Sequence, residues 1–357
     1  MDNWLKFILV FITSAVICFV LSKIVIALAY KFKILDYPRG ERKIHSQPTP
    51  LLGGLAIYFT LVIMIVILGQ NQQLLDTRID VSMISWFLFS GLILMVNGYL
   101  DDKYQIKPYV SILGPILASL AVIIGGLKIV YVTNPGGGVL YLDQLFSALP
   151  GGGDFFIFLI TFIWLMGITY TTKLLDGIDG LASSIGLIAS IVVFVVSLSW
   201  DVVGSTTSLL ALTLAGALLG FLFMNWHPAK IFLGEGGSTF VGFSLGVLAI
   251  ISGSKIATAL LVMGLPVLDI FWVILRRWKK KRSWYQGDNE HLHFRLLRAG
   301  FSQQQVVMFF AAVSLAFGLV SIFFTTKTKI GALIILLATM AFLSTWLNYK
   351  LKKIETN

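Results

Sequence analysis

Two pairs of closely spaced aspartates are the residues of this sequence best suited to chemistry. Asp101 and Asp102 are adjacent at the end of an apolar run, and Asp176 and Asp179 lie in the segment Asp-Gly-Ile-Asp-Gly. Adjacent carboxylates in such a place repel each other, and a divalent cation or a proton relieves the repulsion. Mg²⁺ takes oxygen ligands from one or two carboxylates together with substrate phosphates. The plainer interpretations are a solvated helix end for the first pair and an ordinary turn for the second.

A glycine-rich segment from Asn225 to Thr239 adds a further acidic group. Its glycines allow an anion to approach the backbone closely. Glu235 is a candidate metal ligand in this loop, and Phe232 offers a stacking surface for a base. We expect Ser238 or Thr239 to cap the helix that follows.

His291, His293 and Arg295 lie in the longest basic loop. Residues two apart do not share a helix face, so we expect the histidines on extended or turning backbone. They lack the carboxylate-rich spacing of a zinc protease motif, and phosphate binding is the better functional interpretation. His45 is a lone loop histidine, either a ligand or simply solvated. Asp269, deep in an apolar run, either bonds to a neighbouring helix or lines a polar cavity.

Membrane-spanning helices must position these residues. The 357 residues are 57% hydrophobic and only 12% charged, with a mean hydropathy of +0.89. Soluble proteins carry about 25% charged residues. This composition excludes a soluble enzyme, a disordered chain and a free nucleic-acid-binding module. We expect an all-α polytopic membrane protein that forms a single domain over residues 1–357.

Apolar runs of sufficient length predict about eleven transmembrane helices. They lie at residues 4–30, 51–69, 82–100, 109–127, 154–172, 181–199, 206–224, 238–252, 255–275, 304–325 and 330–349. A small hairpin from Val130 to about Pro150 is expected outside the membrane core. Cys18 is the single cysteine, so no intramolecular disulfide can form.

Lys and Arg are distributed unequally between alternate loops. Most of the 27 lie on the side of residues 31–50, which predicts an outside N-terminus and a cytoplasmic C-terminus. The acid pairs and the histidines played no part in that assignment, yet they fall on the same cytoplasmic side, opposite the hairpin. Polar chemistry is therefore expected at the cytoplasmic face.

Carboxylates, glycine-rich segments, histidines and arginines at one membrane face are the parts that phosphoryl chemistry needs, because it depends on positioning and on neutralising developing charge. The membrane location suggests that one substrate is a lipid. An ion- or proton-coupled transporter is an alternative, although its ionisable residues would be expected nearer the bilayer midplane.

The motifs resemble, in order, those of the polyprenyl-phosphate N-acetylhexosamine-1-phosphate transferase family. The match runs from about residue 31 to 300. It comprises Arg42-Lys43-Ile44-His45, Asp101-Asp102, Leu175–Leu181, Phe232–Ser238 and His291-Leu292-His293. The resemblance implies Mg²⁺-dependent transfer, with Mn²⁺ as an alternative ion, of a sugar 1-phosphate from a UDP-N-acetyl sugar to undecaprenyl phosphate, with release of UMP. Eleven spans and a cytoplasmic C-terminus resemble the branch that uses UDP-N-acetylglucosamine in the bacterial cytoplasmic membrane.

The residues and the resemblance together give each candidate an expected role. The expected catalytic residues are Asp101, Asp102, Asp176, His291 and His293; the expected substrate-binding residues are His45, Lys173, Asp179, Asn225, Phe232 and Arg295; and the expected metal ligands are Asp102, Asp176 and Glu235. By resemblance, Asn225 and Phe232 hold the uracil.

Three features depart from the family pattern. Glu235 stands where the family has a metal-binding Asp, Lys173 and Tyr170 stand where it has asparagines, and Gln105 stands where it often has an acid or a lysine. Lys173 either contacts a phosphate directly or lowers metal affinity. A member that binds polyprenyl phosphate or nucleotide without catalysis is therefore a further alternative. The Gly-rich spans also allow a homodimer.

Overall fold

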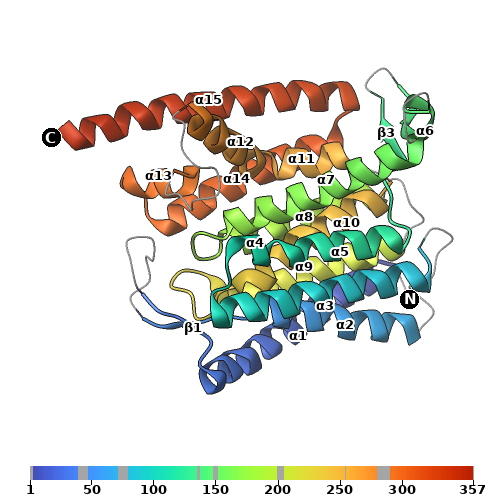
Figure 1. Cartoon of the computed structure of the whole chain (residues 1–357), viewed down its shortest axis with the longest axis horizontal. Helices are drawn as coiled ribbons and strands as arrows, with labels where there is room; N and C mark the ends of the chain where they lie inside the picture. Colours follow the sequence, from blue (N-terminus) through green and yellow to red (C-terminus); the bar gives the residue numbers. More distant parts are fainter. Residues whose placement is uncertain are drawn as a thin grey trace.

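The computed structural model shows a bundle of helices with two very short sheets (Figure 1). It describes residues 3–38, 47–70, 79–134, 137–147, 152–198, 205–253, 255–279 and 290–356. The helices are α1 (Asn3–Phe32), α2 (Gly53–Gln70), α3 (Val81–Tyr104), α4 (Pro108–Ser111), α5 (Leu113–Ile124), α6 (Leu142–Leu145), α7 (Gly152–Leu175), α8 (Leu181–Leu198), α9 (Thr206–Asn225), α10 (Gly234–Ile251), α11 (Ile256–Val262), α12 (Gly264–Lys279), α13 (Leu292–Arg298), α14 (Gln303–Phe323) and α15 (Thr326–Thr356). The strands are β1 (Leu35–Asp36), β2 (Thr49–Pro50), β3 (Tyr131–Thr133) and β4 (Val139–Tyr141).

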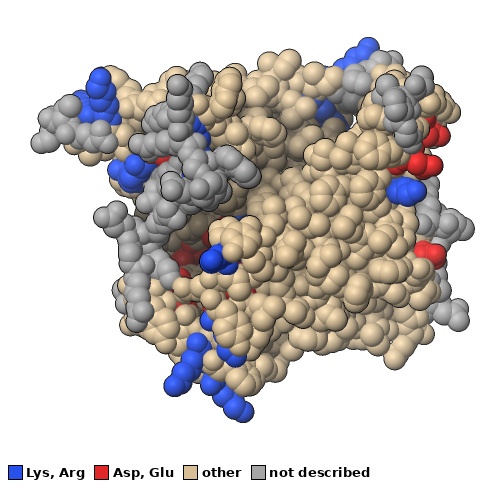
Figure 2. All heavy atoms as spheres, in the orientation of Figure 1, with Lys and Arg blue, Asp and Glu red and all other residues tan. Residues whose placement is uncertain are grey.

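The predicted all-α polytopic fold is confirmed. Among the described residues, nine helices are long and apolar enough to cross a membrane. Charged side chains gather toward the two ends of the molecule in Figure 2 and leave a broad uncharged band between them. A bilayer of about 30 Å hydrocarbon thickness demands such a band.

All eleven predicted apolar runs fall on helices, although two of them are not simple spans. The run 255–275 is divided between α11 and α12, which meet at an angle of 77°. The run 109–127 forms α4 and α5, which together make only a shorter apolar helix, Pro108–Ile124. Hydropathy detects both runs, but it carries no information on the bend.

The two ends of the bundle differ. The N-terminus, α6 and the predicted hairpin, an antiparallel pairing of β3 with β4, lie at one end (Figure 1). The C-terminus, β1 and α13 lie at the other. The second sheet pairs Leu35 with Pro50 and Asp36 with Thr49, so it ties the end of α1 to the start of α2.

The core of the bundle is formed by α9 and α10, in whose most apolar windows 83% of residues are buried. α10 packs against α2, α3 and α7. Glycines make two of these crossings close. A Cβ added at Gly98 of α3 would lie 2.2 Å from the Gly236 Cα, and one at Gly54 of α2 would lie 2.2 Å from the Gly237 Cα. Three backbones therefore meet at the start of α10 without side chains between them.

Candidate active site

A cavity of about 440 Å³ opens at the end of the bundle that carries the C-terminus. In Figure 2, acidic atoms lie recessed in a hollow at this end. The acidic residues that line the cavity are Asp36, Asp101, Asp102, Asp176, Asp179 and Glu235. Among the described lining residues, Lys173 is the only Lys or Arg. The cavity is thus strongly negative and carries one built-in cation.

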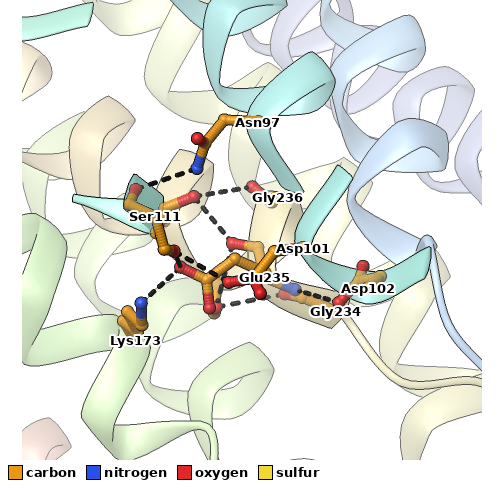
Figure 3. Close-up of polar contacts among 10 residues, drawn as sticks. Asn97, Asp101, Asp102, Ser111, Lys173, Gly234, Glu235 and Gly236 are labelled. Atoms are coloured by element: carbon orange, nitrogen blue, oxygen red, sulfur yellow. Dashed lines mark hydrogen bonds and ion pairs between the residues drawn. The ribbon is translucent and has the colours of Figure 1, made fainter. Parts of the chain in front are cut away.

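The pair Asp101 and Asp102 lies in the last turn of α3, facing the start of α10 (Figure 3). The backbone N–H of Glu235 donates to Asp102 Oδ1 at 3.0 Å, so the first turn of α10 holds this carboxylate. The Ser111 hydroxyl donates to Asp101 Oδ2 at 2.7 Å and lies 3.3 Å from Glu235 Oε1. A helix N-terminus stabilises nearby negative charge. The crossing of α3 with α10 therefore brings three carboxylates to one wall of the cavity.

Glu235 lies in the first turn of α10, which begins at Gly234, and not in a loop as the sequence suggested. The expectation that Ser238 or Thr239 caps this helix is wrong. Both residues lie inside it, with hydroxyls that donate to carbonyls one turn back, for example Ser238 Oγ to the Gly234 oxygen at 3.1 Å. Gly234 at the start of the helix has a φ of +73°, which suits glycine because it carries no Cβ.

Lys173, in the last turn of α7, forms an ion pair with Glu235 of the neighbouring helix α10. Its Nζ lies 2.5 Å from Glu235 Oε1, and the two side chains are only 23% and 14% exposed (Figure 3). The ammonium also lies 5.2 Å from the centre of the Tyr170 ring. The two family departures Lys173 and Glu235 are therefore direct partners of each other.

The segment after α7 breaks the helix. Residues 176–180 form turns before α8, with Gly180 at a φ of +77°. Asp176 lines the cavity and is partly buried, and this burial, followed by the charges of Glu235 and Asp179, raises its pKa to about 7. A desolvated carboxylate among like charges favours a proton or a bound cation.

Asp179 is held by the loop that follows α9. Its Oδ2 lies 2.7 Å from His227 Nδ1 and accepts from the Ala229 N–H at 3.1 Å. Its own N–H donates to Gln303 Oε1 at 3.3 Å. Two separate segments, the loop after α9 and the start of α14, thus fix the position of the second acid of this pair.

Asn225 joins two walls of the cavity. Its Oδ1 accepts from the Gly180 N–H at 3.1 Å and the Ser183 hydroxyl at 2.7 Å, while Nδ2 donates to the Ile231 oxygen at 2.9 Å. Phe232 also lines the cavity. Its backbone is anchored because its N–H donates to the Pro50 oxygen at 2.9 Å. The two residues expected to hold uracil are therefore adjacent to the acidic wall.

The histidines lie behind the cavity. His291 precedes α13 and His293 lies within it, so the expected extended backbone applies only to the first. Their rings stack with centres 5.8 Å apart, and a Cβ on Gly177 would lie 2.4 Å from His293 Nε2. Burial lowers the pKa of His293 to about 4, so this ring is neutral at pH 7.

Asp269 of α12 orients the first histidine. Its Oδ2 lies 2.9 Å from His291 Nδ1, and its Oδ1 accepts from the Leu292 N–H at 2.9 Å. The interpretation of Asp269 as a hydrogen-bond partner for a neighbouring element is confirmed. An Asp on Nδ1 leaves Nε2 as the nitrogen available for other contacts.

Two predicted binding residues are not placed at the cavity. Arg295 is 1% exposed and donates through Nη2 to Asn348 Oδ1 of α15 at 2.6 Å. Burial lowers its pKa to about 10, which leaves it charged at pH 7. His45 lies outside the described residues.

The structure adds residues that sequence reasoning did not select, namely Asp36, Ser111, His227 and Gln303. The histidine carried one signal, since it lies two residues after Asn225 in the same glycine-rich segment. The other three lie in segments without a local motif, so only the fold brings them to the cavity.

A divalent cation would be bound by the carboxylates at the crossing of α3 with α10, namely Asp101, Asp102 and Glu235. Among the described residues, no three His, Cys, Asp or Glu side chains converge tightly enough to form a preformed metal site. Mg²⁺ does not require one, because it binds through one or two carboxylates together with substrate phosphates. Asp101 and Glu235 share the Ser111 hydroxyl, and Asp102 accepts from the backbone of Glu235. These residues fit a cation that arrives with a phosphate-bearing substrate.

Comparison with known proteins identifies the class of membrane protein to which this helical bundle with its acidic cavity belongs. Residues 84–253 match the model of glycosyl transferase family 4. The chain is 29% identical over 350 residues to the probable undecaprenyl-phosphate N-acetylglucosaminyl 1-phosphate transferase of Bacillus subtilis, covering 96% of this chain and 91% of that protein. It is 31% identical over 359 residues to the decaprenyl-phosphate N-acetylglucosaminephosphotransferase of Mycobacterium tuberculosis, covering 92% and 86%.

A more distant relative is the phospho-N-acetylmuramoyl-pentapeptide-transferase of Carboxydothermus hydrogenoformans, 29% identical over 322 residues, with 84% of this chain and 93% of that protein covered. The chain belongs to glycosyl transferase family 4. The resemblance seen in its motifs is therefore confirmed.

Proposed function

We propose that the chain transfers a sugar 1-phosphate from a UDP-N-acetyl sugar to undecaprenyl phosphate at the cytoplasmic face of a bacterial membrane, and so starts synthesis of a cell-envelope glycan. N-acetylglucosamine 1-phosphate is the proposed group, because the relatives from Bacillus and Mycobacterium are named for it. The observation that carries the proposal is the cavity itself, where six acidic residues and Lys173 meet at the ends of membrane-spanning helices.

In the proposed reaction, an oxygen of the lipid phosphate bonds to the sugar-bearing phosphorus of the UDP-sugar. The bond from that phosphorus to the bridging oxygen breaks, and UMP leaves with the bridging oxygen. Asp101 and Asp102 are proposed to orient the lipid phosphate, since both lie where α3 ends. Asp176 and Asp179 flank the diphosphate on the opposite wall, and Asn225 and Phe232 hold the uracil.

Mg²⁺ would be held by Asp102, Asp176 and Glu235 and would neutralise charge on the phosphates. The negative charge of these acids would otherwise repel two phosphorylated substrates. Asp269 positions His291, and His293 abuts Gly177 between the second pair of acids. We propose that the two histidines set the position of that turn against the diphosphate.

The test uses the full chain purified in detergent with undecaprenyl phosphate, MgCl₂ and, in separate reactions, UDP-N-acetylglucosamine or UDP-N-acetylgalactosamine. UMP and the lipid-linked sugar are measured together. The expected result is equal amounts of both products, lost when the lipid is omitted or EDTA is added. UMP release without the lipid, or no release with either sugar while a known family member is active, would contradict the proposal.

A further inference from the structure

Lys173 and Glu235 form an ion pair in the lining of the acidic cavity. Lys173 comes from the last turn of α7 and Glu235 from the first turn of α10, so the pair joins two neighbouring helices that line the cavity (Figure 3). The pair is largely shielded from water, at 23% and 14% exposure, and it is short at 2.5 Å. An ion pair in such surroundings is stronger than one at an open surface.

The charges around this pair are unbalanced. Lys173 faces Glu235 together with Asp101, Asp102 and Asp176 on the cavity wall. One ammonium satisfies one carboxylate of this group, and the others keep the cavity attractive to a cation. A diphosphate entering the same cavity brings further negative charge, and Lys173 is the single described Lys or Arg of the lining that can meet it.

The ion pair therefore opposes both the binding of a cation to Glu235 and the binding of a substrate phosphate to Lys173. While Lys173 is bonded to Glu235 Oε1, its positive charge disfavours a second cation at the same carboxylate. The ammonium is likewise held away from a substrate phosphate. Both groups become available only when the pair opens.

We propose that Lys173 is the resident counter-cation of the cavity, which moves from Glu235 to the diphosphate of the nucleotide sugar and thereby frees Glu235 for a divalent cation. This inference rests on the proposed function, because it takes the diphosphate as the group that receives Lys173. The inference also links the two departures from the family pattern, because the side chain of Glu235, one methylene longer than that of Asp, bonds to Lys173.

Loss of the Lys173 ammonium is expected to change the affinities for Mg²⁺ and for UDP in opposite directions. The substitution Lys173→Met keeps the approximate length of the side chain but leaves Glu235 without its ion-pair partner. Mg²⁺ alone is then expected to bind about tenfold more tightly, because it no longer competes with an internal cation. UDP, measured in EDTA, is expected to bind about tenfold more weakly, because its diphosphate loses the ammonium.

The experiment titrates the purified full chain with MgCl₂ alone and, separately, with UDP in EDTA, by calorimetry. Lys103→Met is the matched control. It removes a lysine that bonds to the Tyr99 hydroxyl and does not line the cavity, and both affinities should stay within twofold of the unaltered chain. Lys173→Arg keeps the charge and should retain the UDP affinity within about threefold. Thermal melts of each variant confirm folding.

Unchanged or weaker Mg²⁺ binding by Lys173→Met, or unchanged UDP binding, overturns the inference. A lysine with a structural role alone would lower thermal stability without tightening Mg²⁺. Failure of the proposed function has a different signature, since the unaltered chain would then bind no UDP with or without Mg²⁺.

Discussion

Asp102 shows how single residues of this cavity depend on one another. Its carboxylate accepts the Glu235 N–H at the start of α10, and it adjoins the Asp101 carboxylate that bonds to Ser111. An amide oxygen in place of the carboxylate could still accept the same N–H. Charge and hydrogen bonding can therefore be separated at this position.

Asp102→Asn is expected to lower the rate of UMP release by at least about 100-fold, because the charge that faces the substrates is lost while the backbone contact is kept. Membrane insertion and thermal stability should change little. Asp154→Asn serves as the control, since Asp154 is 92% exposed near Lys128 at the other end of the bundle. Full turnover by Asp102→Asn would contradict the assigned role.

His293 titrates in an unusual range because it is buried. Its folded pKa of about 4 lies below the ordinary value of 6.5, so the unfolded chain takes up a proton first as the pH falls. Stability is therefore lost between about pH 6.5 and pH 4, by up to about 3 kcal/mol. His293→Gln should show a shallower fall in Tm than the unaltered chain from pH 7.5 to 4.5, and identical slopes would contradict this account.

At the scale of elements, the crossing of α3 with α10 decides whether the acidic wall exists. Gly98 and Gly236 meet backbone to backbone there, one turn before Asp101 and Asp102. Any side chain at Gly98 must separate the two helices, and the contact between Asp102 and the Glu235 N–H would then lengthen. The geometry of the site thus depends on a position that carries no functional group.

Gly98→Ala is expected to reduce activity by at least about tenfold and to lower the Tm, because the added methyl meets the Gly236 backbone at 2.1 Å from its nitrogen. Gly167→Ala in α7 is the matched control, since a Cβ there has no neighbour within 4 Å among the described residues. Ala also favours a helix over Gly by about 1 kcal/mol. Equal activity and equal Tm of the Gly98→Ala and Gly167→Ala variants would show that α3 and α10 can move apart without loss of function.

Sequence reasoning succeeds where the signal is local. Hydropathy locates every span, because a helix in lipid must be apolar along its length. It fails where the position depends on distant partners. The start of α10 at Gly234 is set by contacts with α2 and α3, and Arg295 is directed to Asn348 by the docking of α15. The bond between Lys173 and Glu235 joins two motifs 62 positions apart, and neither motif predicts it.

At the scale of the whole molecule, the N-terminus and the β3–β4 hairpin lie at one end, and the cavity and C-terminus lie at the other (Figure 1). The excess of Lys and Arg in the loops at the cavity end favours the cytoplasm for that end. Nucleotide sugars are cytoplasmic substrates in the proposed reaction, so charge and chemistry agree on the orientation.

Labelling of single cysteines in intact cells tests this orientation, and Cys18 is buried and does not interfere. Asn134→Cys, in the hairpin, should react with a membrane-impermeant maleimide added outside. Lys353→Cys, near the C-terminus, should react only after the membrane is permeabilised. The reverse pattern would invert the proposed topology and move the cavity to the outer face.

The backbone contacts of Gly54 with Gly237 and of Gly98 with Gly236 also limit how this protein can diverge. A substitution at Gly54 or Gly98 collides with the main chain of α10, so no compensating change of a side chain can restore the fit. The spacing of α2, α3 and α10 is therefore closed to gradual change. Adaptation to a different sugar has to proceed through side chains that line the cavity, such as Glu235 at the start of α10 and Lys173 at the end of α7.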